Sequence, residues 1–385
     1  MYFWAMSNYD YIIIGAGASG LLLADALGSD DFFQSKSILL IDKDDKTQND
    51  RTWCFWEIGV GDFDNLLQKS RSSIYFAGKN LRLSTSIEPY TYKMLRGLDF
   101  YTYYKTKIGS YKNILRITDT VDSVTETSNG MEVRTTKNSY RAKTVFNSIF
   151  SYDSLYQQNQ YPVLQQHFIG WFVKTERPIF DAKQATFMDF SVPQKGNTRF
   201  MYVLPLSEKE ALFEYTLFSK NLLDKGEYED AIIDYLNVHY PEEPYIITEK
   251  EQGSIPMTAH PFHRENTDTH LSIGIAGGWA KPSTGFTFYN TAKHVKKLIE
   301  HLKEQRPLSI FHKKDKFWFY DMLLLDVLAK NNHLGQSIFE SLFKKRKSSL
   351  ILKFLDNSTN FWEDVQMMSA PRPLPFIRAL LGRIF

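Results

Sequence analysis

The sequence predicts a mixed α/β fold that joins a Rossmann-like dinucleotide-binding domain, an antiparallel-sheet domain and a C-terminal helical region. A short apolar run at residues 11–14 leads directly into a glycine turn and a helix start, which is the order of a βαβ dinucleotide-binding unit. Four stretches between residues 167 and 217 alternate in side-chain character, as the strands of an antiparallel sheet do. Beyond residue 287, apolar residues recur at helical spacing.

The first unit carries glycines at the spacing of a phosphate-binding turn. Gly15 permits the tight turn, Gly17 lets the backbone approach a pyrophosphate, and Gly20 lets the following helix pack closely on the strand. The second apolar strand ends in Asp42, roughly 20 residues beyond Gly20, where an acid that binds ribose is expected, and this favours FAD or NAD over NADP. A glycine turn without a ligand is the alternative. The predicted cofactor-binding residues are Gly15, Ala16, Gly17, Ala18, Ser19, Gly20 and Asp42.

The later elements follow from periodicity and from turn residues. A hairpin at Ser128, Asn129 and Gly130 is expected within a strand-rich block at residues 118–148. A strand and a second glycine turn are expected at residues 271–285. The predicted helices are residues 92–104, 227–239, 288–301, 316–329, 337–343 and 348–355.

These elements group into three regions, and 385 residues are enough to give two domains a substantial core. The dinucleotide-binding domain is expected to be discontinuous, because the antiparallel sheet interrupts it. The expected regions are residues 8–80, 105–160 and 250–300 for the dinucleotide-binding domain, 81–104 and 161–249 for the substrate-binding domain, and 301–385 for the helical region.

The composition excludes several kinds of partner and site. The 46 basic and 44 acidic residues give a net charge of +2, so no general attraction to nucleic acid is expected. Cys54 is the single cysteine, which rules out an intramolecular disulfide and a cysteine-cluster metal site and fits a reducing cytoplasm. No run of about 18 apolar residues predicts a transmembrane helix, and residues 1–8 do not resemble a secretion signal. The 15% of aromatic residues suits a polyene ligand or an aromatic core.

Residues 49–57 place aromatic side chains beside ionisable ones. The aromatic faces would stack on a flavin ring or line a pocket for a cationic intermediate, and Arg51 would reach a pyrophosphate. A folded corner of the core is the alternative interpretation. The residues of interest in this segment are Asp50, Arg51, Trp53, Phe55, Trp56 and Glu57.

Glu214 interrupts an otherwise apolar and aromatic strand. Strand alternation turns Phe213 and Tyr215 to one side and Glu214 to the other, with Leu212 and Thr216. If that side is a ligand tunnel, desolvation raises the pKa of the carboxyl group, which then acts as a general acid. If that side faces water, Glu214 is an ordinary polar strand residue.

A second cluster of glycines, at residues 274–285, precedes a predicted helix. Its backbone N–H groups would suit a ribityl chain or the edge of a flavin ring. Flavoproteins of the aromatic hydroxylase fold carry an aspartate after the glycine here, and its absence from this chain argues against an ordinary hydroxylase.

Taken together, the phosphate-binding glycine turn at residues 15–20, here called the cradle, and four further segments resemble the bacterial lycopene cyclases. This is the flavoprotein family that makes β-ionone rings in carotenoids. The resemblance covers nearly the whole chain and implies the fold of aromatic hydroxylases and geranylgeranyl reductases, with FAD as cofactor. The four segments are IDKDDKTQNDRTWCFWE, FMYVLPLSEKEALFEYTLFS, EQGSIPM and GIAGGWAKPSTGFTF.

The resemblance also implies roles for individual residues. Glu214 matches the carboxylate taken as essential for cyclisation, with Asp50 and Glu57 as further catalytic candidates. Arg51, Gly277, Gly278, Lys281, Ser283 and Thr284 are the further candidates for FAD binding, and Trp53, Phe55, Trp56 and Tyr215 are the candidates for substrate contact.

The implied reaction is an isomerisation of lycopene and related linear carotenoids to γ-carotene and β-carotene, without net redox change. A ψ end group is protonated at its terminal double bond, the cation closes a ring, and loss of a proton gives the β-ring. Reduced FAD would assist, kept reduced by NADPH or NADH. A flavin-dependent hydroxylase, a geranylgeranyl-reductase-like oxidoreductase and a non-catalytic carotenoid-binding flavoprotein are the alternatives.

The C-terminus is basic and apolar. Residues 344–347 are all basic, and residues 375–385 would lie in a lipid interface with their arginines at the headgroups. A solvated charge run followed by a docked helix is the alternative. The first interpretation predicts a peripheral protein on the cytoplasmic face of the cell membrane, with Phe376, Ile377, Leu381, Ile384 and Phe385 in the lipid.

Overall fold

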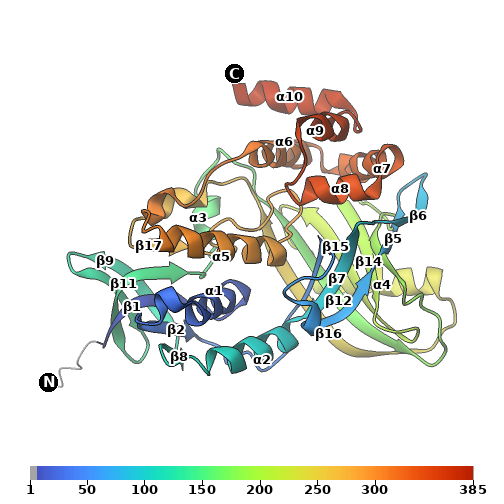
Figure 1. Cartoon of the computed structure of the whole chain (residues 1–385). Coiled ribbons are helices and arrows are strands. Elements are labelled where there is room, and N and C mark those ends of the chain that lie inside the picture. The colour runs from blue at the N-terminus through green and yellow to red at the C-terminus, as the bar shows by residue number, and fades with distance from the viewer. Residues whose placement is uncertain (1–6, 385) are drawn as a thin grey trace.

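The computed structural model describes residues 7–384, which form two seven-stranded sheets, a three-stranded sheet and a helical C-terminal region (Figure 1). In the first sheet, parallel strands run in the order β8-β2-β1-β11-β17, and β10 and β9 continue it in antiparallel fashion beyond β11. Its strands are β1 (Ser7–Ile14), β2 (Ile38–Asp42), β8 (Ile114–Thr118), β9 (Val121–Thr127), β10 (Gly130–Thr135), β11 (Ser139–Asn147) and β17 (His270–Ser272).

The predicted βαβ unit and the predicted hairpin are both confirmed. Helix α1 (Ala18–Ser29) follows β1 directly and packs between α2 (Gly97–Ile108) and α5 (Phe288–Lys303). Gly20 permits this packing, because a Cβ there would lie 1.8 Å from the carbonyl oxygen of Gly15. Gly15 itself has a φ of +95°, a conformation that favours glycine.

The second sheet is predominantly antiparallel and has the order β16-β12-β15-β14-β13-β5-β6. One face packs against α4 (Lys225–His239), and the other packs against α7 (Gly335–Lys345) and α8 (Ser348–Leu355). The four predicted strands of the antiparallel domain are therefore confirmed. The strands are β5 (Ser73–Ala77), β6 (Arg82–Ser86), β12 (Leu164–Thr175), β13 (Gln184–Asp189), β14 (Thr198–Pro205), β15 (Glu210–Ser219) and β16 (Tyr245–Met257).

The helix predicted at residues 92–104 begins too early. Residues 90–96 instead form β7 (Tyr90–Arg96), the central strand between β3 (Thr52–Ile58) and β4 (Leu67–Arg71). Pairing on both edges outweighs local helix propensity here, so α2 begins only at Gly97. The sequence also groups residues 73–77 with the first domain, whereas the structure pairs them, as β5, with β13 of the second sheet.

The C-terminal region contains two helices that the periodicity did not separate, α9 (Phe361–Met368) and α10 (Pro373–Ile384). Helix α10 docks on α6 (Lys316–Lys330), where Arg383 pairs with Asp326 at 2.7 Å. Arg383 thus pairs within the protein, Phe376 packs on the core, and Phe385 lies outside the described residues. A short helix, α3 (Asp153–Tyr156), precedes β12. Within residues 7–384, no helix has both the length and the apolar character needed to cross a membrane.

A methyl group added at Gly20 and one added at Gly17 should affect stability differently. We expect Gly20→Ala to lower the free energy of unfolding by about 2 kcal/mol or more, because α1 must move away from the glycine turn. A Cβ at Gly17 would have no atom within 4 Å apart from those of its chain neighbours, so Gly17→Ala should change the free energy of unfolding by less than about 1 kcal/mol. Urea denaturation measures both, and equal losses would contradict this packing.

Candidate active site

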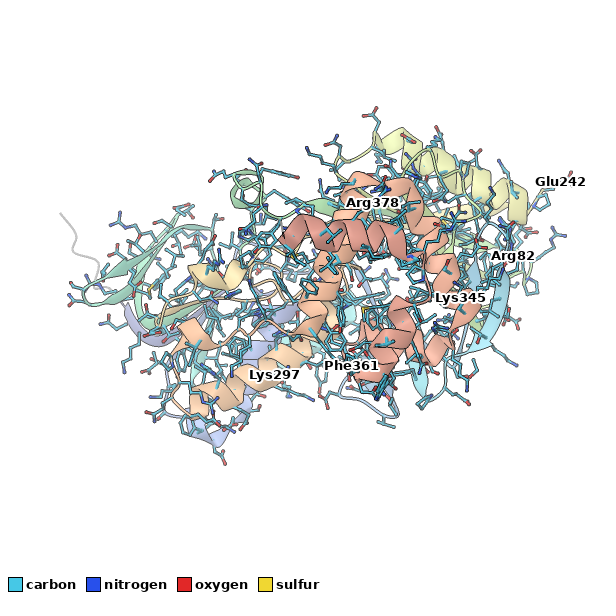
Figure 2. All side chains as sticks on the ribbon, turned by 90° about the horizontal axis from the view of Figure 1, so that it is seen from above. Arg82, Glu242, Lys297, Lys345, Phe361 and Arg378 are labelled. Atoms are coloured by element: carbon cyan, nitrogen blue, oxygen red, sulfur yellow. The ribbon has the colours of Figure 1, made fainter. Side chains whose placement is uncertain are left out.

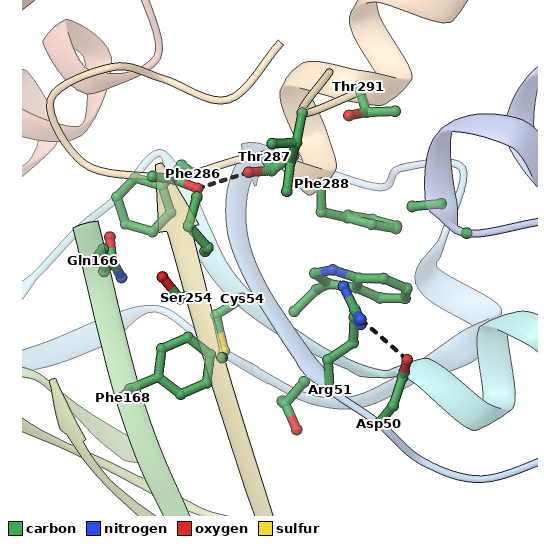
Figure 3. Close-up of a pocket in the computed structure, with 18 of the residues that line it drawn as sticks. Asp50, Arg51, Cys54, Gln166, Phe168, Ser254, Phe286, Thr287, Phe288 and Thr291 are labelled. Atoms are coloured by element: carbon green, nitrogen blue, oxygen red, sulfur yellow. Dashed lines mark hydrogen bonds and ion pairs between the residues drawn. The ribbon is translucent and has the colours of Figure 1, made fainter. Parts of the chain in front are cut away.

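A cavity of about 360 Å³ lies between the glycine turn of the first sheet and the inner face of the second sheet (Figure 3). Its size lies within the range usual for cofactor and small-molecule sites. One end is formed by the start of α1 and by Asp50 and Arg51, and the opposite wall by β12, β15 and β16. The residues of this wall labelled in Figure 3 are Gln166, Phe168 and Ser254. Cys54 of β3 lies beside them, and Phe286, Thr287, Phe288 and Thr291 lie above.

The α1 end of the cavity has the features of an anion-binding cradle. Gly17, Ala18 and Ser19 line it, and no side chain caps the helix at Gly17. The first N–H groups of α1 therefore have no partner within the helix, and the positive end of the helix dipole lies there. Asp42 does not line the cavity. Its carboxylate accepts from the Ala16 and Asp44 N–H groups and so holds the turn against β2.

Arg51 and Asp50 form a charged edge beside this cradle. Arg51 Nη2 lies 3.1 Å from Asp50 Oδ2, and the Tyr101 hydroxyl donates to Asp50 Oδ1 at 2.8 Å. Burial opposes ionisation of Asp50, but the Arg51 charge and these hydrogen bonds outweigh it, so the pKa of Asp50 is lowered. Trp53 lines the cavity next to them, stacked on Phe288 with ring centroids 4.8 Å apart.

Glu214 projects into the cavity from β15, as strand alternation predicts. Leu212 lines the cavity with it, whereas Phe213 and Tyr215 pack on the opposite face against α4. Burial raises the pKa of the Glu214 carboxyl group, and the hydrogen bond from Thr216 Oγ1 at 2.7 Å offsets part of that rise. Glu214 is therefore held protonated into the neutral range, which is the state a general acid requires.

Four of the predicted catalytic and substrate-contact residues lie outside the cavity. Glu57 is buried and pairs with Lys93 Nζ at 2.9 Å, and its other oxygen accepts from Tyr289. The long-range pairing of β3 with β7 places Lys93 there, which spacing along β3 alone could not indicate. The other three are Phe55, Trp56 and Tyr215. Phe55 packs on Phe63 and Tyr289, and Trp56 donates to the Leu352 carbonyl oxygen at 3.1 Å. The hydroxyl group of Tyr215 accepts a hydrogen bond from Arg199.

The second glycine loop also differs from its predicted role. Lys281 is buried and its Nζ lies 3.0 Å from Asp321 Oδ2, while Ser283 donates to the other oxygen of Asp321 at 2.6 Å. These two residues attach the loop to α6. Gly277, Gly278 and Thr284 line small separate recesses. The residues of this loop and of the start of α5 that line the main cavity are Gly274, Ile275, Gly285, Phe286, Thr287, Phe288 and Thr291.

Glu251 is a residue of interest that the sequence reasoning missed, although the EQGSIPM segment contains it. It is 5% exposed, and its Oε2 accepts from Thr52 Oγ1 at 2.8 Å. Burial raises the pKa of this carboxyl group as well. The strand register is what associates Glu251 with the site, because Gly170 of β12 pairs with both Glu214 and Glu251.

The paired sheets, the cradle and the cavity define a protein with the flavoprotein fold of the geranylgeranyl reductase type. The fold resembles a geranylgeranyl bacteriochlorophyll reductase-like protein from Thermoplasma acidophilum, with a TM-score of 0.61 and 12% identity over 97% of this chain and 99% of that one. A flavoprotein/dehydrogenase from Cytophaga hutchinsonii gives a TM-score of 0.59 and 10% identity over 98% and 100%. Among residues 7–384, no cluster of three or more metal-ligating side chains occurs.

The chain belongs to the lycopene cyclase family, because the family model described as lycopene cyclase protein matches residues 10–381. A lycopene beta-cyclase from Paracoccus sp. (strain N81106 / MBIC 01143) is 27% identical over 129 residues. That alignment spans 32% of this chain and 32% of the relative, about a third of each.

The two carboxyl groups Glu57 and Glu214 should respond differently to amide substitution. Glu57→Gln removes a charge from the buried pair with Lys93, so we expect the free energy of unfolding to fall by about 1–3 kcal/mol. Glu214→Gln replaces a protonated carboxyl group with an amide of the same shape, so a change below about 1 kcal/mol is expected at neutral pH. Chemical denaturation at pH 7 compares them. A larger loss for Glu214→Gln would show that Glu214 is ionised.

Proposed function

We propose that this protein is a lycopene cyclase that converts the ψ end groups of lycopene and related linear carotenoids into β-ionone rings, giving γ-carotene and β-carotene. The reaction is an isomerisation by acid–base chemistry with no net redox change. The single observation that carries the proposal is the position of the Glu214 carboxyl group, whose pKa is raised by burial, in the wall of a cavity that begins at a dinucleotide cradle. Family membership supports the substrate class.

Cyclisation needs an acid, a dry pocket and aromatic faces. Glu214 gives its proton to the terminal double bond, the resulting cation closes the six-membered ring, and a neighbouring ring carbon returns a proton to a carboxylate. Trp53, Phe168 and Phe286 line the cavity and would stabilise the cation through their ring faces. The proton balance is therefore closed within the site.

A small separate apolar recess lies next to the cavity, on the side of the C-terminal helices. Tyr202 and Phe286 line both the cavity and the recess, and Phe339, Phe343 and Ile351 of α7 and α8 close its far side. A polyene chain that places one end group beside Glu214 would extend in this direction. This arrangement favours a long apolar substrate over a small polar one.

FAD is the cofactor that the cradle fits. Gly17 leaves room for a pyrophosphate against the uncapped N–H groups of Ala18 and Ser19, and Arg51 would neutralise its charge. The amide oxygen of Gln166, buried without a partner within residues 7–384, would accept from an N–H group of a bound ring. When bound in its reduced form, with NADPH or NADH as reductant, FAD would supply an electron-rich ring that stabilises the cation.

Peripheral attachment to the cytoplasmic face of the cell membrane is the remaining part of the proposal. The C-terminal helices α9 and α10 both lie at the upper side of the molecule in Figure 1, and Figure 2 views this side with Phe361 of α9 and Arg378 of α10 labelled. Trp362 is 72% exposed, and apolar side chains of this kind beside basic ones suit an anionic lipid surface. The exposed apolar residues of α9 and α10 are Phe361, Trp362, Val365, Met368, Leu374, Ile377, Leu381 and Ile384.

Expression in a bacterial host that accumulates lycopene tests the reaction. We expect the chain to convert lycopene to γ-carotene and β-carotene, and Glu214→Gln to reduce ring formation by at least about a hundredfold, because the general acid is lost. Pigments are separated by chromatography, and bound flavin is measured by absorbance in both proteins. The Gly17→Ala protein should keep its stability but lose bound flavin.

Other outcomes would favour the alternative functions. Product formation that consumes oxygen, or NADPH in proportion to product, would indicate a hydroxylase or a reductase. A purified protein that binds lycopene and reduced FAD without forming rings would indicate a carotenoid-binding flavoprotein. Ring formation by Glu214→Gln at the native rate would contradict the assigned role of Glu214.

Vesicle flotation tests the membrane surface. We expect the double variant Phe361→Ser, Trp362→Ser to bind vesicles containing anionic lipid at least about tenfold more weakly, because the two largest exposed apolar side chains of α9 are lost. The matched control is Val238→Ser, Ile246→Ser, which alters two equally exposed apolar residues outside the C-terminal helices. Equal loss in both double variants would contradict the assignment to α9.

A further inference from the structure

Glu214 and Glu251 stand in one row across the second sheet, on the two strands that flank β12. Gly170 of β12 pairs with Glu214 of β15 on one side and with Glu251 of β16 on the other. Directly paired residues point their side chains to the same face of a sheet, so both carboxyl groups stand on the cavity face. Between them the central position has no side chain.

The side chain of Glu251 leans across this empty position. A Cβ at Gly170 would lie 3.1 Å from Glu251 Cγ and 3.5 Å from Glu251 Oε1, and 2.9 Å from Leu212 Cδ1 of β15. Glu251 Cγ and Oε1 therefore lie over Gly170 of β12, on the face of the sheet that carries Glu214. Any larger residue at position 170 would separate the two carboxyl groups.

One oxygen of Glu251 lacks a hydrogen-bond donor. Oε2 accepts from Thr52, whereas Oε1 is buried without a partner among the described residues. Buried acceptors are nearly always satisfied, so an unpaired carboxylate oxygen calls for a nearby proton. The O–H of a protonated Glu214, on the same face of the sheet, is the donor that this geometry offers.

The titratable groups around Glu214 differ in charge from those around Glu251. Those facing Glu214 are neutral, because burial raises the pKa of Cys54 to about 12 and holds the pKa values of Tyr92 and Tyr202 well above their usual range. Glu251 instead has two guanidinium groups near it, together with one further carboxylate. These neighbours are Arg96, Arg51 and Glu249. Arg96 forms an ion pair with Glu249, and Arg51 forms one with Asp50. A negative charge is thus better tolerated at Glu251 than at Glu214.

We propose that Glu251 is a positioning residue that shares a single proton with Glu214 and so keeps that proton on the cavity side of the pair. The inference rests on the proposed function. When Glu214 gives its proton to the terminal double bond, the pair carries two negative charges beside the substrate cation, and like-charge repulsion makes it a strong proton acceptor. The ring carbon then returns one proton to the pair, and the O–H of Glu214 is restored.

The pH profile of cyclisation tests the shared proton. Deprotonation of Glu214 sets the alkaline limb of the profile, and the charge on Glu251 pushes that limb to higher pH. We expect Glu251→Gln to move the limb to lower pH by about one unit or more. Thr216→Val removes a hydrogen bond that favours the carboxylate, so its limb should move to higher pH.

Two opposite shifts keep the test informative even if Glu251→Gln folds poorly. The control is Glu210→Gln. Glu210 is the first residue of β15, the strand that carries Glu214, and lies outside the cavity, so this variant should leave the alkaline limb in place. If Glu251→Gln leaves the limb in place and lowers the rate equally at every pH, while Thr216→Val moves the limb, Glu251 has only a structural role and the inference is wrong.

Infrared titration of the full-length protein without substrate separates this inference from the proposed function. A protonated-carboxyl band that disappears in Glu214→Gln and titrates at lower pH in Glu251→Gln supports the pair whether or not rings form. A band of unchanged midpoint in Glu251→Gln overturns the pair even if lycopene is cyclised. Absence of ring formation with the expected band shifts would instead sink only the proposed function.

Discussion

Desolvation of Glu214 is the constraint on which the candidate site depends. An ionised carboxylate in this wall would face only neutral groups and one like charge, so the protein keeps it as the acid. The surrounding elements maintain that state by excluding water. Helix α4 covers the outer face of β15, α7 and α8 cover part of the inner face, and β3 of the three-stranded sheet lines another side of the cavity. Acid strength at Glu214 is therefore a property of the packing of both sheets.

Features set by local sequence could be predicted, because their determinants lie within a few residues. The strand, turn and helix around Gly15 and Gly20 depend on contacts within one βαβ unit, and the inward orientation of Glu214 depends on alternation along β15. Alternation also places Tyr215 on the opposite face, so its proposed substrate contact conflicted with the same rule. Asp42 was correctly located at the end of β2, but its role in holding the turn required the contact with Ala16.

Features set by distant partners could not be predicted in this way. Glu57 lies in the segment that supplies Trp53 to the cavity, yet Lys93 and Tyr289 hold it inside the core. Lys281 lies in a glycine loop, yet Asp321 of α6 turns it away from the cavity. Glu251 lies among polar residues of β16, where nothing in the local sequence marks its side chain as buried. The one local hint was Gly170, since a glycine inside a long strand often marks a close approach of other groups.

The arrangement also explains how one fold accommodates different chemistry. Solved structures share this fold at 10–12% identity, so backbone pairing and the glycine turn can maintain it with many sequences. The acid pair has stricter requirements. It needs carboxyl groups on β15 and β16 and a missing side chain between them on β12, all on one face. A rigid antiparallel sheet fixes that spacing better than a loop would. The proposed chemistry of this protein is thus concentrated in a few inward positions of three neighbouring strands, while the proposed cradle at the start of α1 would bind a dinucleotide.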